Sequence, residues 1–170
     1  MFISSDTNVW IDFQKVGHLD YPFRLNFVYY ISRDTFCEEF LTPESMKIEL
    51  LKRGLQFAEM TDLEFTQAMI FQSHYRGLSQ YDAFALAIAK QRGWTLLTGD
   101  MPLRKAAMRE CVDVHGIIWI YDQLKDQGKM TDDEFFSAMN ELIDAVKNGR
   151  CRLPMEELLK RRGTQVEGHE

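Results

Sequence analysis

Two aspartates follow directly on predicted strands, and their position suggests chemistry. The first strand covers residues 2–4 and leads to Asp6, while a later strand, Trp94–Thr98, leads to Asp100. In an open α/β sheet the carboxyl ends of parallel strands meet at one edge, and ligands bind at that edge. We therefore expect Asp6 and Asp100 to lie beside each other.

A third carboxylate, Asp82, stands in the first turn of an alanine-rich helix that stops at Gly93 and feeds the later strand. It points to the same edge if the loop 77–80 lies there. Three converging carboxylates repel one another unless a cation sits between them. Mg²⁺ and Mn²⁺ prefer such oxygen ligands, and a metal held this way can activate water and neutralise charge on a phosphodiester.

Each of these residues also has a structural interpretation as a helix cap. Asp6 and Asn8 are both strong N-cap types. Asp82 follows Ser79 at capping-box spacing and suits the positive end of a helix, and Asp100 can begin the helix that follows it. Two matching strand ends favour a shared metal site over separate caps.

Composition limits the class of protein. The 170 residues suit one domain, and the contents of 45% hydrophobic and 27% charged residues are ordinary for a globular chain. A net charge of -6 argues against general binding of nucleic acid by a basic surface. It does not exclude a nuclease, because metal ions bound to carboxylates supply local positive charge.

Other composition signals concern location and metals. No apolar run approaches the roughly 20 residues of a membrane span, and no signal peptide is expected. Three widely spaced cysteines form neither a disulfide framework nor a C-x-x-C pair, so we expect a reducing, cytoplasmic setting. The four histidines lack zinc-site spacing and are expected at the surface or in loops.

Strand-like runs alternate with segments of helical period, which predicts a three-layer α/β fold with a central parallel sheet. Strands are expected at residues 2–4, 27–31, 55–60, 94–98 and 111–114. Helices are expected at residues 9–15, 35–41, 43–54, 62–75, 82–93, 102–110, 117–125, 132–146 and 155–162. Pro43 is expected at the first position of its helix, and Phe65, Ala68, Met69 and Gln72 recur at helical spacing in another.

The chain is expected to form one domain with an appendage. Residues 1–120 carry the α/β pattern, whereas residues 121–170 contain only helical patterns and a polar end. We interpret 121–170 as a helical extension of the same domain that finishes in a mobile tail.

Three segments together resemble PIN-domain ribonucleases. They are Asp6-Thr-Asn8, Leu78-Ser-x-x-Asp82-Ala-x-Ala-Leu-Ala and Leu96-Leu-Thr-Gly-Asp100-x-x-Leu-Arg-x-Ala, and the resemblance covers roughly residues 1–120. It implies a Rossmann-like sheet and a carboxylate quartet that binds one or two Mg²⁺ or Mn²⁺ ions. It further implies cleavage of single-stranded RNA to a 5′-phosphate and a 3′-hydroxyl.

The resemblance also implies a glutamate between the first two motifs. Glu49 falls on the solvent side of its predicted helix, whereas periodicity does not separate Glu38 from Glu39. The family pattern has an apolar residue three positions before the glutamate and another just after it. Phe36 and Phe40 satisfy that pattern around Glu39, although many relatives have leucine where Phe40 stands.

Smaller roles follow from the same resemblance. Asn8 and Thr98 match polar positions that assist the acids; alternatively, they satisfy backbone groups at the strand ends. Arg76, Arg104 and Lys105 lie near the second and third motifs in sequence and are candidates to contact RNA phosphates, or else form solvated helix faces.

The sequence thus predicts a metal-dependent endoribonuclease whose catalytic and metal-binding residues are Asp6, Glu39, Asp82 and Asp100. Many relatives are toxins, so an antitoxin partner and a homodimer are further expectations. One alternative is a PIN-fold binding module with a weak or unused metal site. Another is a haloacid-dehalogenase-like phosphatase, which needs Asp-x-Asp after the first strand, where this chain has Asn8.

Overall fold

The computed structural model describes residues 1–163. The tail predicted to be mobile falls mostly within residues 164–170 and so lies outside the described residues. Within the described part, no helix is long and apolar enough to cross a membrane.

A single five-stranded parallel sheet forms the centre of the fold, as the alternating pattern predicts. Its strands run in the order β3-β2-β1-β4-β5. Their bounds are β1 Phe2–Ser5, β2 Val28–Ser32, β3 Gln56–Ala58, β4 Thr95–Leu97 and β5 Val114–His115. β1 is the middle strand and pairs with β4 in the register Ser5 to Leu97, so Asp6 and Thr98 follow at the same edge.

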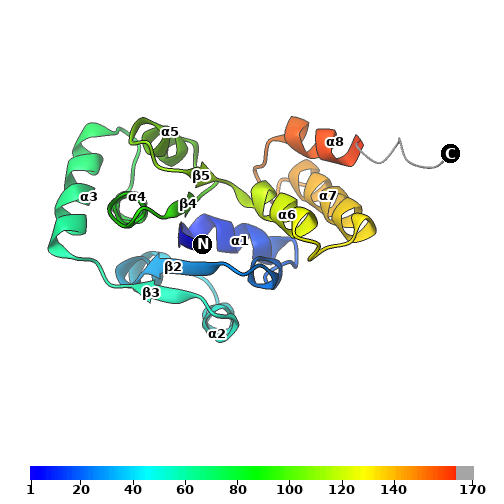
Figure 1. The fold of residues 1–170 in the computed structure, drawn as a ribbon, viewed down its shortest axis with the longest axis horizontal. Helices are drawn as coiled ribbons and strands as arrows, with labels where there is room; N and C mark the ends of the chain where they lie inside the picture. Colours follow the sequence, from blue (N-terminus) through cyan, green and yellow to red (C-terminus); the bar gives the residue numbers. More distant parts are fainter. Residues whose placement is uncertain (164–170) are drawn as a thin grey trace.

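Helices cover both faces of this sheet (Figure 1). They are α1 Thr7–Lys15, α2 Glu44–Arg53, α3 Asp62–His74, α4 Gln80–Arg92, α5 Met101–Arg109, α6 Ile117–Asp126, α7 Asp132–Lys147 and α8 Met155–Gly163. A 3₁₀ turn, η1, spans Tyr21–Arg24, and a π-helix, η2, spans Thr35–Glu39. The arrangement is the predicted three-layer α/β/α fold.

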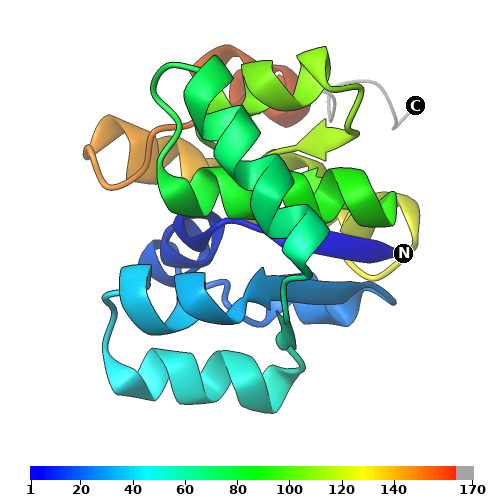
Figure 2. The ribbon, with the colours of Figure 1, turned by 90° about the vertical axis from the view of Figure 1, so that its left-hand side faces the viewer.

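The sheet separates two hydrophobic clusters. On one face α4 lies against β1 and β4, and α3 crosses over α4 as an outer layer (Figure 2). The small side chains of α4 allow a close approach, so that the Ser4 hydroxyl donates to the Ala85 carbonyl at 2.9 Å. This contact ties the helix that carries Asp82 to the strand that carries Asp6.

The C-terminal helices share the cluster on the other face. Phe13 of α1 packs against Tyr121 of α6 with ring centroids 5.9 Å apart. Leu142 of α7 and Leu158 of α8 are fully buried in the same cluster as Ile3 of β1. We therefore treat α6, α7 and α8 as part of the same folding unit as the sheet.

Three predicted features differ in detail. β5 begins at Val114 and not at Cys111, because Cys111 and Val112 donate to the carbonyls of Met108 and Ala107 and so close α5. Cys111 there has φ 56°. The expected short helix after β2 is a π-helix. Pro43 is the N-cap residue just before α2 and not its first helical residue.

Burial also differs from expectation at two places. On α3 the side chains of Phe65 and Met69 are 46% and 36% exposed, because this helix lies in the outer layer. Of the four residues at helical spacing Ala68 is buried, together with Phe71. His18 lies in the loop after α1, which is one of the two positions expected for it, but it is not at the surface. Its ring is buried and lies 2.8 Å from the Tyr121 hydroxyl and 2.7 Å from the Glu141 carboxylate.

Shared packing makes a prediction for Leu142→Ala. Truncating this fully buried side chain should lower the free energy of unfolding of the whole chain by about 2–5 kcal/mol. Urea denaturation followed by circular dichroism should show one transition, shifted as a unit. Leu159→Ala on α8, where the side chain is 43% exposed, is the control and should change little. Two separate transitions, with the first alone affected by Leu142→Ala, would contradict a shared core.

Candidate active site

Asp6 is the most enclosed carboxylate at the carboxyl edge of the sheet. It follows β1, is 3% exposed, and its backbone N–H donates to the Leu97 carbonyl at 3.1 Å. Thr98, which is fully buried at the end of β4, donates its hydroxyl to Asp6 Oδ2 at 2.9 Å. The amide of Asn8 approaches the same oxygen at 3.5 Å. Thr98 and Asn8 thus both contact the Asp6 carboxylate, and their supporting roles stay a prediction.

Thr98 also connects the two strand-end aspartates. Its hydroxyl oxygen accepts from the backbone N–H of Asp100 at 3.1 Å while donating to Asp6. One side chain thus fixes the carboxylate after β1 and the backbone at the start of α5. The adjacency expected from two matching strand ends is realised through this contact.

The π-helix η2 determines which glutamate faces Asp6. Thr7 Oγ1 lies 3.3 Å from Asp6 Oδ1 and 3.2 Å from Glu39 Oε2, so its single hydroxyl proton is shared between the two carboxylates. The neighbouring Glu38 is exposed and accepts from the Tyr81 hydroxyl at 2.9 Å. Glu39, and not Glu38, therefore lies against the Asp6 side chain.

Asp82 and Asp100 are helix caps as well as members of the acidic group. Asp82 Oδ2 accepts from the Ser79 N–H at 2.8 Å in a complete capping box, and Asp100 Oδ2 accepts from the Leu103 N–H at 2.9 Å. In each residue Oδ1 accepts no hydrogen bond from residues 1–163. The capping interpretation and the metal interpretation are compatible, because each uses a different oxygen.

The four carboxylates share one electrostatic field. Burial, and secondly the charge of Asp82, raise the pKa of Asp6 from 3.8 to about 6. Burial followed by Asp6 and Asp82 raises the pKa of Glu39 from 4.5 to about 7. The pKa of Asp82 is raised mainly by burial, with Asp100 contributing. Like charges at this edge thus penalise one another's ionised forms.

No cation within the described chain offsets these charges. None of the four carboxylates forms an ion pair with a residue between 1 and 163. The side chains also do not converge on one point: across these residues no three His, Cys, Asp or Glu side chains are placed to enclose a metal ion. The donor set suits a hard divalent cation by chemistry, whereas binding one requires these side chains to move closer.

The three predicted RNA contacts lie in different environments. Arg76 in the loop before α4 and Lys105 on α5 are exposed. Arg104 is half-buried and donates Nη1 to the Thr98 carbonyl at 3.2 Å. Arg104 alone of the three is thus joined by hydrogen bonding to the residue that holds Asp6.

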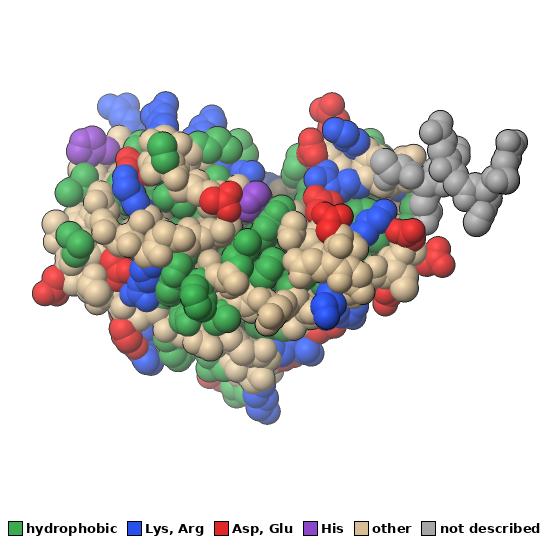
Figure 3. Space-filling view, viewed as in Figure 1, with side chains coloured by type: hydrophobic (Ala, Val, Ile, Leu, Met, Phe, Trp, Pro, Cys, Tyr) green, Lys and Arg blue, Asp and Glu red, His purple; other side chains and the backbone are tan. Residues whose placement is uncertain are grey.

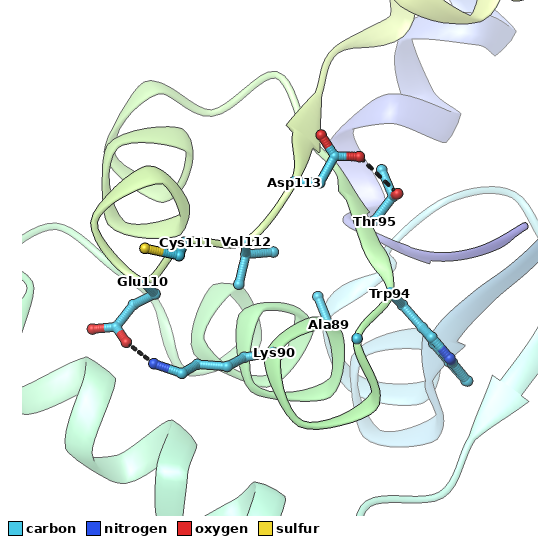
Figure 4. A pocket seen from close by; sticks show the side chains of 9 residues that line it. Ala89, Lys90, Trp94, Thr95, Glu110, Cys111, Val112 and Asp113 are labelled. Atoms are coloured by element: carbon cyan, nitrogen blue, oxygen red, sulfur yellow. Dashed lines mark hydrogen bonds and ion pairs between the residues drawn. The ribbon is translucent and has the colours of Figure 1, made fainter.

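A pocket of about 390 Å³ opens elsewhere, at the amino end of β4 and so at the opposite end of that strand from Asp100. Its polar side chains pair with one another, Lys90 with Glu110 and Thr95 with Asp113 (Figure 4). Because these polar groups already bond to one another, they are poorly placed to bind a ligand. We therefore assign no function to this pocket.

Residues 2–163 match the sequence profile of a PIN-domain family. This chain belongs to the PIN-domain family. No curated protein and no solved structure gives a significant match. The PIN domain is a nuclease-type fold whose members are generally hydrolases and typically bind divalent metals. The resemblance noted for residues 1–120 therefore extends through the C-terminal helices of this PIN domain.

Sequence reasoning missed two contacts in the PIN-domain site. Thr7, between the two named residues of the first motif, bridges Asp6 and Glu39 through its hydroxyl. Tyr81, just before Asp82, holds Glu38 away from the acids. Both residues lie inside the quoted motifs, yet only the position of the π-helix shows what they contact.

The raised pKa values predict how the stability of the metal-free protein depends on pH. Between about pH 4 and pH 7 the folded chain keeps protons on Asp6 and Glu39 that the unfolded chain releases. Their contribution to the free energy of unfolding therefore falls as pH rises through this window. Asp6→Asn should gain stability relative to the wild type as pH increases, measured by urea denaturation with a chelator at several pH values. A wild-type-to-variant difference that stays constant from pH 4 to pH 8 would contradict the shift.

Proposed function

We propose that this PIN-domain protein is a metal-dependent endoribonuclease that hydrolyses phosphodiester bonds of single-stranded RNA. Asp6, Glu39, Asp82 and Asp100 are its proposed catalytic and metal-binding residues. The supporting observation is that four carboxylates from four separate segments share one field at the carboxyl edge without a cationic partner in residues 1–163. A structural role alone does not account for grouping like charges in this way.

The chemistry of the acids fits Mg²⁺ or Mn²⁺, one or two ions. All four offer hard oxygen ligands, and burial followed by neighbouring acids raises the pKa values of Asp6 and Glu39, so positive charge placed there favours their ionised forms. A divalent ion held there supplies that charge, draws in the phosphate and acidifies water. Because cation and protons compete for the same oxygens, metal affinity should rise with pH.

The chain's own residues orient this site. Thr98 and Asn8 hold Oδ2 of Asp6, and Thr7 sets the spacing between Asp6 and Glu39. The capping bonds hold one oxygen each of Asp82 and Asp100, which restricts how far these carboxylates rotate. Fixed ligands reduce the reorganisation needed when a charged substrate binds.

The alternatives are weaker. A haloacid-dehalogenase-like phosphatase needs a second acid where Asn8 stands, and the Asn8 amide instead approaches Asp6. A binding module with an unused metal site would not cleave RNA, so an activity assay distinguishes it from a nuclease. We also propose a cytoplasmic setting, because the three cysteines form no disulfide bond. A toxin role, an antitoxin partner and a homodimer stay predictions from the family resemblance.

The activity test compares strand-end acids with an acid elsewhere. With Mn²⁺ the wild type should cleave a labelled single-stranded oligoribonucleotide and leave 5′-phosphates. Asp6→Asn and Asp100→Asn should lower the rate by at least about a hundredfold, because removing one group that stabilises transition-state charge costs roughly that much. Asp113→Asn, at the amino end of the sheet, is the control and should retain activity. Equal activity in all four proteins would leave the nuclease function without support.

Adjacent glutamates give a matched test of the fourth ligand. Glu39 lies against the Asp6 carboxylate group through Thr7, whereas Glu38 is bonded to Tyr81. Glu39→Gln should therefore weaken Mn²⁺ binding in calorimetry by about tenfold or more, while Glu38→Gln should change it by less than about twofold. The reverse order of effects would assign the ligand to Glu38.

A further inference from the structure

Arg104 has an arrangement that neither capping nor packing explains. Its guanidinium is half-buried on α5 and donates only Nη1, to the Thr98 carbonyl at 3.2 Å. Thr98 in turn donates to Asp6. Thr98 thus connects the Arg104 guanidinium to the acidic group. Both the guanidinium and the acids lie at the carboxyl edge of β4.

The charge of Arg104 has no partner among residues 1–163. It forms no ion pair there, and burial lowers its pKa, although an arginine stays protonated at neutral pH. Asp100 stands four residues earlier, a spacing suited to ion pairs, yet its Oδ2 accepts from the Leu103 backbone instead. This half-buried guanidinium therefore has no carboxylate of residues 1–163 as its partner.

The remaining donors of Arg104 form the geometry that recognises phosphate. Nε and Nη2 lie along one edge of the guanidinium, and neither donates to an acceptor in residues 1–163. That edge makes two parallel hydrogen bonds to a phosphate or a carboxylate. Nη1, bonded to Thr98, fixes the orientation of the group while leaving this edge available.

Gly116 makes room for the guanidinium. A Cβ atom at this position would lie 3.2 Å from Nη1 of Arg104 and 3.7 Å from the Thr98 carbonyl. Gly116 has φ -104° and ψ -177°, a conformation open to any residue, so backbone freedom does not require glycine here. Space for Arg104 is the reason that the structure offers for a glycine between β5 and α6.

The surroundings are also favourable to an anion. The first half of α5 carries Arg104 and Lys105, and Figure 3 shows Lys and Arg side chains gathered along the edge that α5 forms. The first turn of α6, which follows Gly116, contains no acidic residue. This edge is thus positive beside a site that is otherwise acidic.

We propose that Arg104 binds a phosphate of the RNA strand next to the bond that is cleaved, and that Gly116 keeps the space in which it does so. This role rests on the function proposed above and singles out Arg104 from the three basic residues near the site. Arg76 and Lys105, which are exposed, contribute only to the general attraction of the strand.

The test measures binding separately from cleavage. A fluorescent single-stranded oligoribonucleotide is titrated with the full chain in Ca²⁺, followed by anisotropy at several salt concentrations. Arg104→Ala should weaken binding about tenfold to a hundredfold, as expected for a hydrogen-bonded charge. The slope of log affinity against log salt should become shallower by about 0.7, the value for one phosphate contact to a single strand.

Three further variants separate position from charge. Arg109→Ala removes the same charge from the exposed end of α5 and should change affinity less than about twofold. Arg104→Lys keeps the charge but loses the fork, and should give an intermediate loss while preserving the fold. Gly116→Ala leaves every charge in place and should weaken binding severalfold by displacing the guanidinium.

Each outcome decides between the two proposals. If Arg104→Ala binds as tightly as the wild type, or loses no more than Arg109→Ala, the role of Arg104 is wrong even when the wild type cleaves RNA. If binding depends on Arg104 but Mn²⁺ supports no cleavage, Arg104 remains a phosphate contact for RNA, whereas the nuclease function and the placement beside a cleaved bond both fail. A wild type that neither binds nor cleaves the oligonucleotide overturns both.

Discussion

The Asp6 carboxylate lies almost out of contact with water at the end of the middle strand, and the groups of residues 1–163 that donate to it are all neutral. A buried charge is costly unless it is paired, so the surrounding structure must hold it in place without neutralising it. The polar side chains of β1 serve this by bonding elsewhere: Ser4 to the Ala85 carbonyl and Ser5 to the Tyr30 carbonyl. The alanine-rich α4, the register of β4 and the π-helix then bring three further acids into the field of Asp6.

This arrangement lowers the stability of the metal-free protein, and under the proposed function the same repulsion favours binding of a cation. Carboxylates with raised pKa values resist ionisation in the folded protein, and their mutual repulsion opposes folding at neutral pH. A bound cation that favours the folded chain relieves the repulsion. Stability must therefore come from elsewhere, and the fully buried residues on both faces of the sheet supply it. The shared core with α6, α7 and α8 extends this support beyond the strands themselves.

The strongest local patterns predicted the fold and the strand-end acids. Phe2-Ile3 before Asp6 and the segment Trp94–Thr98 before Asp100 defined the central strands. The capping boxes at Ser79 and Thr61 located α4 and α3. Long-range contacts were not predictable in the same way. Thr7 bridges two acids only because η2 winds as a π-helix, which apolar periodicity does not distinguish from other helices. His18 is buried by residues more than 100 positions away, and β5 shifts because the end of α5 uses the N–H groups expected in the strand.

Anomalous scattering from crystals soaked in Mn²⁺ at neutral pH would test whether the carboxylates around Asp6 bind a divalent cation. We predict a manganese peak at the carboxyl edge of β1, within coordination distance of oxygens of Asp6 and Glu39 and with Asp82 and Asp100 nearby. Crystals that show no peak beside Asp6 at saturating Mn²⁺, while manganese binds elsewhere on the protein, would contradict the account.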